Sequence, residues 1–211
     1  MRLGVFGGTF DPFHRGHVDP VLAAQGELRW DRVVYVPAFR QPFKTGQQTI
    51  SPFHRFAMTV LGTRAHELMY VSPMELDRGD ISYSVDTLEI LRSEHPIDTI
   101  DWIIGDDNLP ALPLWRKLDR ILELANFVVL TRLAGDMFTA ALPDLLRPHV
   151  SAADTRPFHG AVVSAHNPNT TISSTEIRQR LHAGQPVDDL VDPSVSRYIQ
   201  HHGLYQGALF D

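Results

Sequence analysis

The stretch GVFGGTFDPFHRGHVD, residues 4–19, decides the fold of this chain. Two glycines end its apolar run, and an Asp-Pro pair and two histidines follow them. An apolar run that stops at glycines is typical of a buried strand leading into a tight turn, because glycine adopts backbone angles that other residues avoid. The stretch therefore predicts a strand over residues 2–6, a turn, and a helix over residues 17–30 with Pro20 in its first turn, where proline is tolerated.

Short apolar runs rich in Val, Ile and Tyr alternate with helical patterns along the rest of the chain. Further strands are expected over residues 32–38, 69–74, 99–105, 126–132 and 161–165. Helices are expected over residues 51–67, 84–95, 108–125 and 136–147, and within residues 172–184 and 192–203. Pro113 can break the helix over 108–125. This alternation is typical of a single α/β domain, residues 1–211, with a Rossmann-like, doubly wound, mostly parallel sheet and helices on both faces. Such sheets bind ligands beyond the carboxyl ends of their strands, where the strand order reverses, and the opening stretch follows one of those ends.

Several expected helices carry recognisable start signals. Ser51 and Ser84 stand where N-cap residues are expected, and Asp192 stands before a proline that suits the first helical position. Ser173 and Glu176 form the S-x-x-E pattern of a capping box, in which each side chain can satisfy a free backbone N–H group. These signals fix where the C-terminal helices should begin.

Composition limits the classes of partner. The chain has 211 residues, no cysteine and a formal net charge of −6 at pH 7. Without cysteine, disulfides and thiolate zinc sites are excluded. The negative charge argues against a nucleic-acid polymer as partner but allows a small phosphorylated ligand. Residues 1–20 contain neither a membrane-spanning apolar run nor a signal-peptide core, so we expect a cytoplasmic protein without a membrane partner.

The chemistry of the opening stretch suits an anion better than a metal. A plain turn between a strand and a helix would explain the glycines, but it does not explain why His14 and His17 are there. The backbone N–H groups of Gly8, Thr9 and Phe10 can surround a phosphate beside a helix N-terminus. A zinc site is the weaker interpretation, because H-x-x-H lacks the i, i+4 spacing of a helical pair and no further ligand is evident. The stretch matches neither a P-loop nor the G-x-G-x-x-G dinucleotide motif.

Two motifs resemble a known superfamily. GGTFDPFHRGH resembles the (H/T)-x-G-H signature of nucleotidyltransferases, in the form typical of the bacterial nicotinate mononucleotide adenylyltransferase family, and ISSTEIR, residues 172–178, is similar to their second signature. Three segments between them resemble the same family: VPAFRQPFK (36–44), ELDRGDISYSVDTL (75–88) and WIIGDDNLPALPLW (102–115). The resemblance covers nearly the whole chain.

The resemblance implies transfer of AMP from ATP to nicotinate mononucleotide, which gives deamido-NAD and pyrophosphate. The attacking phosphate monoester is already ionised at pH 7, so direct in-line attack on the ATP α-phosphate needs positioning and charge neutralisation rather than a general base. Mg²⁺ is implied as the companion of ATP, held by phosphates and water rather than by a dedicated protein site. The residues implied on the ATP phosphates, beside the backbone N–H groups already named, are His14, His17, Lys44, Ser174, Thr175 and Arg178.

The same resemblance implies residues for the mononucleotide. These are Ser84, Asp107, Trp115, Arg132 and the loop residue Lys44. Trp115 is expected to stack on the pyridine ring, and Arg132 to approach the mononucleotide phosphate. Lys44 is expected to close over the phosphates from the long loop formed by residues 39–50.

Two residues depart from the family pattern. Phe43 replaces the histidine of the common P-H-K sequence, which removes a polar partner for phosphate. Asp106 replaces the alanine of G-A-D and adds a carboxylate. If that carboxylate faced the acceptor, it would disfavour the acidic ring of nicotinate, but strand alternation predicts that Asp106 points away from its neighbour Asp107.

Other functions remain as alternatives. The acceptor could be nicotinamide mononucleotide or phosphopantetheine, although phosphopantetheine adenylyltransferases are shorter and lack the S-Y-x-x-D-T-L segment. A nucleotide-binding regulator without catalysis is a third possibility, and the intact phosphate motifs oppose it.

Overall fold

The computed structural model describes residues 1–44, 49–131, 133–167 and 172–206. These residues form two compact units. Unit 1 comprises Met1–Gly7, Pro20–Val34 and Tyr83–Asn169. Unit 2 comprises Gly8–Asp19, Tyr35–Ser82 and Thr170–Asp211.

The described strands form a doubly wound sheet. They are β1 (Arg2–Gly8), β2 (Arg32–Pro37), β3 (Met69–Val71), β4 (Thr99–Gly105), β5 (Asn126–Thr131) and β6 (Val162–His166), and they pair in the order β3-β2-β1-β4-β5-β6. The pairs β1–β4, β4–β5 and β5–β6 are parallel. This order reverses between β1 and β4, which is where doubly wound sheets bind ligands. The predicted Rossmann-like fold is confirmed.

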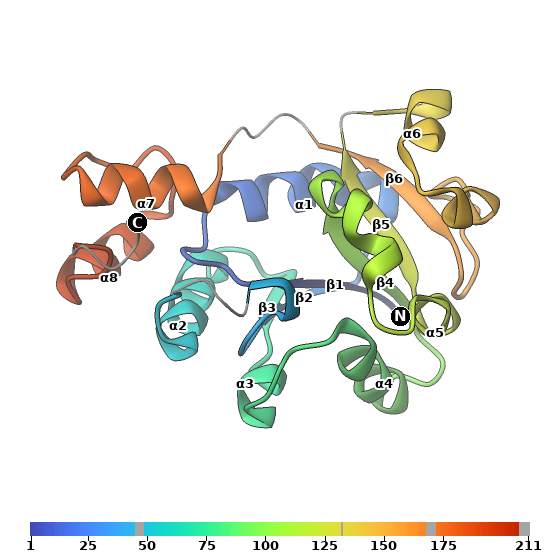
Figure 1. The fold of residues 1–211 in the computed structure, drawn as a ribbon, viewed down its shortest axis with the longest axis horizontal. Helices are drawn as coiled ribbons and strands as arrows, with labels where there is room; N and C mark the ends of the chain where they lie inside the picture. The colour runs from blue at the N-terminus through green and yellow to red at the C-terminus, as the bar shows by residue number, and fades with distance from the viewer. Residues whose placement is uncertain (45–48, 132, 168–171, 207–211) are drawn as a thin grey trace. The chain divides into compact units, whose positions relative to one another are not determined.

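The centre of unit 1 is the pair β4 and β5, which run side by side with β6 beyond them (Figure 1). All residues of β5 and the inner residues of β4 are buried, as expected for parallel strands that are covered on both faces. The helical segments of this unit are α4 (Ser84–Glu94), η2 (Asp106–Leu114), α5 (Leu118–Leu124), α6 (Gly135–Ala141) and η3 (Asp144–His149). Here η marks a 3₁₀ helix.

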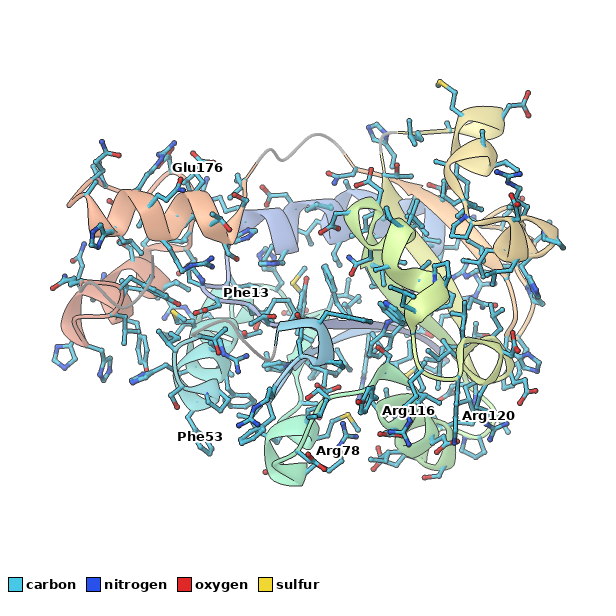
Figure 2. The ribbon with its side chains drawn as sticks, viewed as in Figure 1. Phe13, Phe53, Arg78, Arg116, Arg120 and Glu176 are labelled. Atoms are coloured by element: carbon cyan, nitrogen blue, oxygen red, sulfur yellow. The ribbon has the colours of Figure 1, made fainter. Side chains whose placement is uncertain are left out.

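The outer surface of α4 carries exposed ion pairs. Arg116 and Arg120 reach toward this helix (Figure 2), where they lie 3.4 Å from Asp86 and Glu89 respectively. Arg116 also lies over the ring of Tyr83, 4.7 Å from its centroid. Exposed pairs of this kind contribute little to stability, so the buried interior decides whether unit 1 folds.

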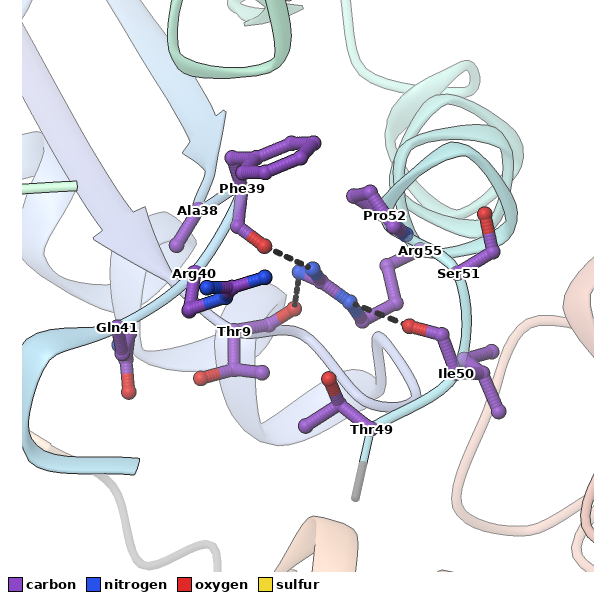
Figure 3. Close-up of a pocket in the computed structure, with 10 residues that line it drawn as sticks. All are labelled: Thr9, Ala38, Phe39, Arg40, Gln41, Thr49, Ile50, Ser51, Pro52 and Arg55. Carbon is purple, nitrogen blue, oxygen red and sulfur yellow. Dashed lines mark hydrogen bonds between the residues drawn. The ribbon is translucent and has the colours of Figure 1, made fainter. Parts of the chain in front are cut away.

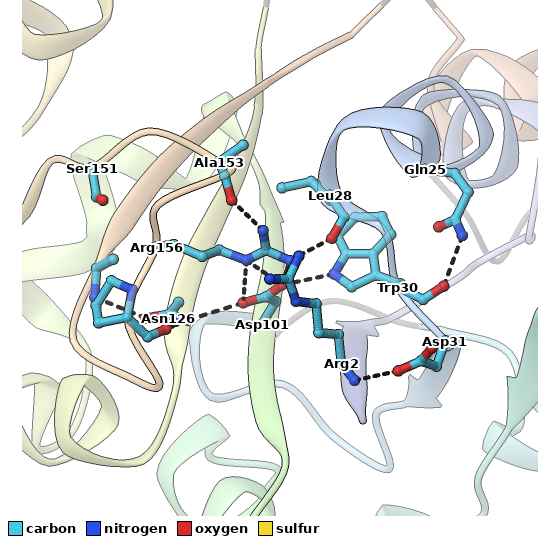
Figure 4. A network of polar contacts seen from close by, with 12 residues as sticks. Arg2, Gln25, Leu28, Trp30, Asp31, Asp101, Asn126, Ser151, Ala153 and Arg156 are labelled. Carbon is cyan, nitrogen blue, oxygen red and sulfur yellow. Dashed lines mark hydrogen bonds and ion pairs between the residues drawn. The ribbon is translucent and has the colours of Figure 1, made fainter.

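A buried polar network lies inside unit 1. The Asp101 carboxylate, on β4, is fully buried and 3.0 Å from an Arg156 guanidinium nitrogen (Figure 4). It also accepts hydrogen bonds from the indole N–H of Trp30 at 2.8 Å and the side-chain amide of Asn126 at 3.1 Å. Arg156 donates further to the carbonyls of Leu28 and Ala153, so this ion pair joins several segments.

Unit 2 contains η1 (Pro42–Lys44), α2 (Pro52–Thr63), α3 (Met74–Arg78), α7 (Ser174–His182) and α8 (Pro193–His201). The predicted caps at Ser51, Ser173 and Asp192 are confirmed, since each side chain accepts a hydrogen bond from a backbone N–H group in the following turn. In the capping box of α7, Glu176 instead turns its carboxylate to Arg180, at 2.7 Å. The helices α2, α7 and α8 therefore start where their local sequences predicted.

Some helix predictions were wrong. Helix α1 (Arg15–Leu28) begins earlier than expected, so Pro20 lies inside it rather than in its first turn. Ser84 is the first residue of α4 rather than its N-cap, which is Tyr83 without a side-chain cap. The strand expected over 69–74 ends at Val71, and residues 74–78, for which no helix was predicted, form α3. The expected helices over 108–125 and 136–147 are each divided into a 3₁₀ and an α segment.

Among the described residues, no helix combines the length and the apolar character needed to cross a lipid bilayer.

Candidate active site

The phosphate loop, which we define as residues 8–14 and name after the ligand that the sequence predicts there, packs on an aromatic cluster in unit 2. Phe10 and Phe13 are buried and contact each other edge to face, with ring centroids 5.4 Å apart. Both also contact the ring of Tyr35. Gly62 on α2 lets Phe13 pack closely, because a Cβ atom there would lie 2.4 Å from the Phe13 ring. Apolar burial thus holds the loop in place.

The two histidines of the opening stretch lie against each other. The rings of His14 and His17 are stacked, with centroids 3.7 Å apart. The backbone N–H of His14 donates to Nδ1 of His17 at 3.2 Å. A neutral imidazole that accepts at Nδ1 carries its proton on Nε2, so His17 presents Nε2–H as a donor. This is the donor that an anion beside the loop requires.

His14 is a buried neutral ring. His14 is only 5% exposed, and burial lowers the pKa of its imidazole from 6.5 to about 3. Its Nδ1 atom is buried and has no hydrogen-bond partner among the residues that the structure describes. A buried ring nitrogen without a partner is unfavourable, and a ligand oxygen would satisfy it if Nδ1 carries the proton. At pH 7, His14 can therefore donate a hydrogen bond but carries no charge.

The buried His14 predicts a loss of stability in acid. The unfolded chain binds a proton at this residue below pH 6.5, whereas the folded chain binds it only near pH 3. The free energy of unfolding should therefore fall by about 1.4 kcal/mol per pH unit from this residue as the pH drops through that window. Denaturant unfolding of the wild type and of His14→Asn at pH 7 and pH 4.5 measures the slope. An equal loss in both proteins would contradict the prediction, and the contribution of other groups cancels in this comparison.

Close packing explains why a glycine, Gly16, stands between the two histidines. A Cβ atom there would lie 2.9 Å from Cε1 and Nδ1 of His14, and 3.2 Å from the carbonyl oxygen of Ile172. Glycine is needed here for close approach, because both the His14 ring and the segment before α7 pack against this position.

We expect Gly16→Ala to displace the His14 ring, and to destabilise the fold by about 1–3 kcal/mol, as overpacking does elsewhere. Binding of ATP, the ligand that the sequence resemblance implies for this loop, should weaken with it. Calorimetric titration with Mg-ATP and thermal unfolding measure the two effects. Gly26→Ala is the matched control, because Gly26 lies on the same helix with nothing within 4 Å of the added methyl group. That control should unfold at a slightly higher temperature than the wild type, since alanine has a higher helix propensity than glycine. Equal behaviour of the two variants would remove Gly16 from this role.

The N-terminal turn of α7 contacts the phosphate loop within unit 2. The Ser174 hydroxyl donates to the carbonyl of Pro12 at 3.1 Å, and the Arg178 guanidinium donates to the carbonyl of Asp11 at 2.7 Å. Arg178 also donates to the hydroxyl of Thr175 at 3.3 Å. The structure thus brings together the predicted residues His14, His17, Ser174, Thr175 and Arg178 around one loop. A helix N-terminus with these side chains favours an anion.

Arg55 holds the other side of the loop. Its buried guanidinium donates to the carbonyls of Thr9 at 2.7 Å, Phe39 at 3.0 Å and Ile50 at 3.2 Å (Figure 3). Because the carbonyl and N–H of one trans peptide point in opposite directions, this bond to Thr9 also fixes the direction of the Phe10 N–H group.

A cavity of about 180 Å³ opens beside these contacts (Figure 3). Its lining includes Thr9, the exposed Arg40 and Gln41. The Thr9 hydroxyl oxygen is buried and has no partner among the described residues. Lys44 ends η1 nearby in sequence, but its side chain lies outside the described part of the chain.

Lys44 belongs to unit 2, and the other residues predicted for the mononucleotide belong to unit 1. Ser84 begins α4, and Asp107 lies in η2, where its carboxylate accepts a hydrogen bond from the side chain of Asn108 at 3.0 Å. Trp115 follows η2 and is half-buried, with its ring edge to face against Phe127 at 6.0 Å. The fourth predicted residue, Arg132, lies outside the described residues.

Asp106 contacts the neighbouring strand. Its carboxylate accepts a hydrogen bond from the Thr131 hydroxyl at 2.9 Å, and that hydroxyl oxygen accepts one from the backbone N–H of Leu133 at 3.0 Å. The carboxylate that departs from the family pattern is thus bound at the carboxyl end of β5. This contact gives Asp106 a role in holding the chain after β5.

Sequence reasoning missed the contacts of Asp11 and Tyr205. The Tyr205 hydroxyl donates to the Asp11 carboxylate at 2.6 Å. No local pattern reveals this pair, because 194 positions separate the two residues. Arg55 also lies outside every motif singled out in the sequence, although its guanidinium joins the loops at Thr9, Phe39 and Ile50.

Comparison with known proteins identifies the family. Residues 5–180 match the family described as cytidylyltransferase-like. The chain belongs to this family. Within it, the chain is 34% identical to a protein named probable nicotinate-nucleotide adenylyltransferase from Thermoanaerobacter sp. (strain X514), over 98% of this chain and 95% of that one. It is 36% identical to a protein of the same name from Roseiflexus sp. (strain RS-1), over 97% and 98% of the two chains.

Solved structures share the fold of this chain. A Plasmodium falciparum nicotinic acid mononucleotide adenylyltransferase complexed with NaAD superposes with a TM-score of 0.72 at 18% identity, covering 100% of this chain and 98% of that one. A putative nicotinate-nucleotide adenylyltransferase from Vibrio parahaemolyticus superposes with a TM-score of 0.65 at 19% identity, covering 99% and 98%. At these identities the likeness concerns the fold.

Proposed function

We propose that this protein transfers AMP from ATP to nicotinate mononucleotide and releases pyrophosphate, the step of NAD biosynthesis that gives deamido-NAD. Its relatives at about a third identity over nearly the full chain carry the corresponding name. The observation that carries the proposal is the phosphate loop of unit 2, where two stacked histidines and the N-terminal turn of α7 surround one short segment. These groups are donors suited to a chain of phosphates.

The proposed reaction needs no general base. The phosphate of the mononucleotide is ionised at neutral pH and attacks the ATP α-phosphate directly, so one P–O bond forms as the bond to pyrophosphate breaks. The protein must align the two groups and stabilise charge on the equatorial and leaving oxygens. We assign His14 and His17 to the α-phosphate and the leaving pyrophosphate, and the helix residues Ser174, Thr175 and Arg178 to the β- and γ-phosphates.

Specific N–H and hydroxyl groups of these residues are the donors that we assign to the phosphates. His17 donates through Nε2–H, and His14 acts as a neutral donor. The Ser174 hydroxyl already donates to Pro12, so its backbone N–H is the group we assign to phosphate. Thr175 is exposed at the helix start and offers both its hydroxyl and its N–H group.

For the mononucleotide we propose Ser84, Asp107, Trp115 and Arg132, with Lys44 approaching from its loop. Trp115 offers the aromatic face on which a pyridine ring would stack. We further propose that residues 1–211 act as one nucleotidyltransferase domain in the cytoplasm, with the C-terminal helices, residues 172–203, completing the site.

Mg²⁺ is the proposed companion of ATP. Among the described residues, no group of three or more His, Cys, Asp or Glu side chains could hold a metal ion. The donors at the phosphate loop are N–H and hydroxyl groups, which suit the phosphate oxygens rather than the cation. A magnesium ion that ATP brings would therefore be held by phosphate oxygens and water, and it would neutralise charge on the leaving group.

Pyrophosphate release from ATP and Mg²⁺ tests the proposal across a panel of acceptors: nicotinate mononucleotide, nicotinamide mononucleotide and phosphopantetheine. We expect the highest kcat/KM with nicotinate mononucleotide. Release only with phosphopantetheine, or with none of the three, would overturn the proposal. Preference for the amide would keep the adenylyl transfer and change the acceptor.

A further inference from the structure

The phosphate loop contains a negative charge that the proposed mechanism does not use. Asp11 lies in the middle of the loop and is only 3% exposed. A carboxylate beside an anion site repels the anion unless other groups compensate its charge. The loop therefore needs groups that bind this carboxylate and keep it from disturbing the anion site.

The partners of Asp11 come from distant parts of unit 2. The Tyr205 hydroxyl donates to Oδ1 at 2.6 Å, and the backbone of Ile50 also favours the charged form of the carboxylate. Burial raises the pKa of Asp11, while these donors and the nearby charges of Arg178 and Arg55 act in the opposite direction. Burial also raises the pKa of Tyr205 well above its usual value, so its hydroxyl remains a donor at every relevant pH.

Arg178 does not pair with this carboxylate. It donates instead to the Asp11 backbone carbonyl and to the Thr175 hydroxyl, both beside the start of α7. An arginine close to a carboxylate with a vacant lone pair would ordinarily form an ion pair with it, because charge-assisted bonds are the stronger ones. The Tyr205 hydroxyl is the side chain that donates to the Asp11 carboxylate instead.

We propose that Tyr205 is a positioning residue for ATP binding: its hydroxyl occupies the Asp11 carboxylate and so leaves Arg178 available for phosphate. The proposal rests on the proposed function, in which Arg178 binds the ATP phosphates. Without the hydroxyl, the Asp11 carboxylate recruits Arg178, and the site loses a cation and keeps a negative charge beside the ligand.

Tyr205→Phe tests the proposal by removing one oxygen atom. Calorimetric titration with Mg-ATP, in the absence of any mononucleotide, should show the dissociation constant rising about tenfold, the size expected for one lost charge-assisted contact. Tyr198→Phe is the matched control, because Tyr198 contacts His54 at 2.9 Å, outside the phosphate loop. It should bind Mg-ATP like the wild type. A Tyr205→Phe variant that binds Mg-ATP as tightly as this control overturns the proposal.

A second variant separates positioning from mere support of the fold. Asp11→Asn in the Tyr205→Phe background removes the charge that would recruit Arg178, so affinity for Mg-ATP should recover most of the tenfold loss. If the hydroxyl served only to stabilise the loop, the double variant would bind as weakly as the single one or more weakly, and the proposal would fail. Both affinities are measured below the unfolding transition of each variant.

Pyrophosphate release by the wild type is measured alongside. Release by the wild type together with an unchanged ATP affinity in Tyr205→Phe overturns this inference and leaves the proposed function intact. A wild type that neither binds Mg-ATP nor releases pyrophosphate overturns the proposed function, and the inference with it.

Discussion

Replacing His17 by alanine is expected to lower the turnover number of the adenylyl transfer by about 10²-fold or more, which is the usual cost of removing one transition-state donor. The geometry supplies the reason. The His14 backbone N–H donates to Nδ1 of His17, so the remaining proton is on Nε2 and points away from that bond. Pyrophosphate release at saturating ATP and nicotinate mononucleotide measures the effect. Turnover close to that of the wild type would exclude His17 from the catalytic role.

Two amide variants test which nitrogen matters. In His17→Gln the side-chain amide can reach the position of Nε2 and still donate there. In His17→Asn it can replace only Nδ1. We therefore expect the Gln variant to retain more turnover than the Asn variant. The reverse order would show that His17 serves mainly to accept the His14 N–H bond.

The His17 ring also packs on Phe13, with centroids 5.3 Å apart, so some loss of stability accompanies its removal. Thermal unfolding of each variant separates that loss from the loss of turnover. His182→Ala is a suitable surface control, because His182 is exposed at the end of α7. It should leave both quantities unchanged.

The elements that the sequence predicted best are those with local signals at both ends. Asp192, Pro193 and Gly203 predicted α8, and in the structure Asp192 caps the helix while Gly203 takes the left-handed conformation after it. The reason is that caps depend on hydrogen bonds within a few residues. Tertiary contacts do not need to be known to recognise them.

The wrong predictions arose where backbone chemistry and packing compete. Residues 106–114 form a 3₁₀ helix with Pro110 and Pro113 inside it, because prolines lack the N–H groups that an α-helix needs. The sequence offered Pro113 as a break in the helix over 108–125, but it did not predict the 3₁₀ form. Pro20 shows the opposite outcome, because α1 continues through it. Buried neighbours such as Val18 and Val21 support that helix on both sides of the proline.

The candidate site also has a part that local sequence predicted and a part that it did not. Both phosphate motifs are contiguous in sequence, so their residues could be predicted individually. The contacts that hold the phosphate loop could not, since Arg55 reaches Thr9 across 46 positions and Tyr205 reaches Asp11 across 194. Such contacts depend on the folded path of the chain, and a single sequence contains no local pattern for them.

The interior of unit 1 gives the largest expected effect on stability. Arg156→Met should lower the free energy of unfolding by about 3–5 kcal/mol, the usual cost of removing one partner of a buried ion pair. The Asp101 carboxylate would remain, fully buried, with only the neutral donors of Trp30 and Asn126. The carbonyls of Leu28 and Ala153 would also lose their donor. Chemical denaturation at pH 7 measures the change.

The double variant Asp101→Asn/Arg156→Met decides whether charge is the cause. Removing both charges leaves no uncompensated carboxylate, so the double variant should be more stable than Arg156→Met alone, even though it carries one more substitution. Arg120→Ala is the control, because its ion pairs with Glu89 and Glu123 lie at the surface, and it should barely move the unfolding midpoint. If the double variant were instead less stable than the single one, packing and the carbonyl contacts of Arg156, rather than the buried Asp101 charge, would account for the stability of this network.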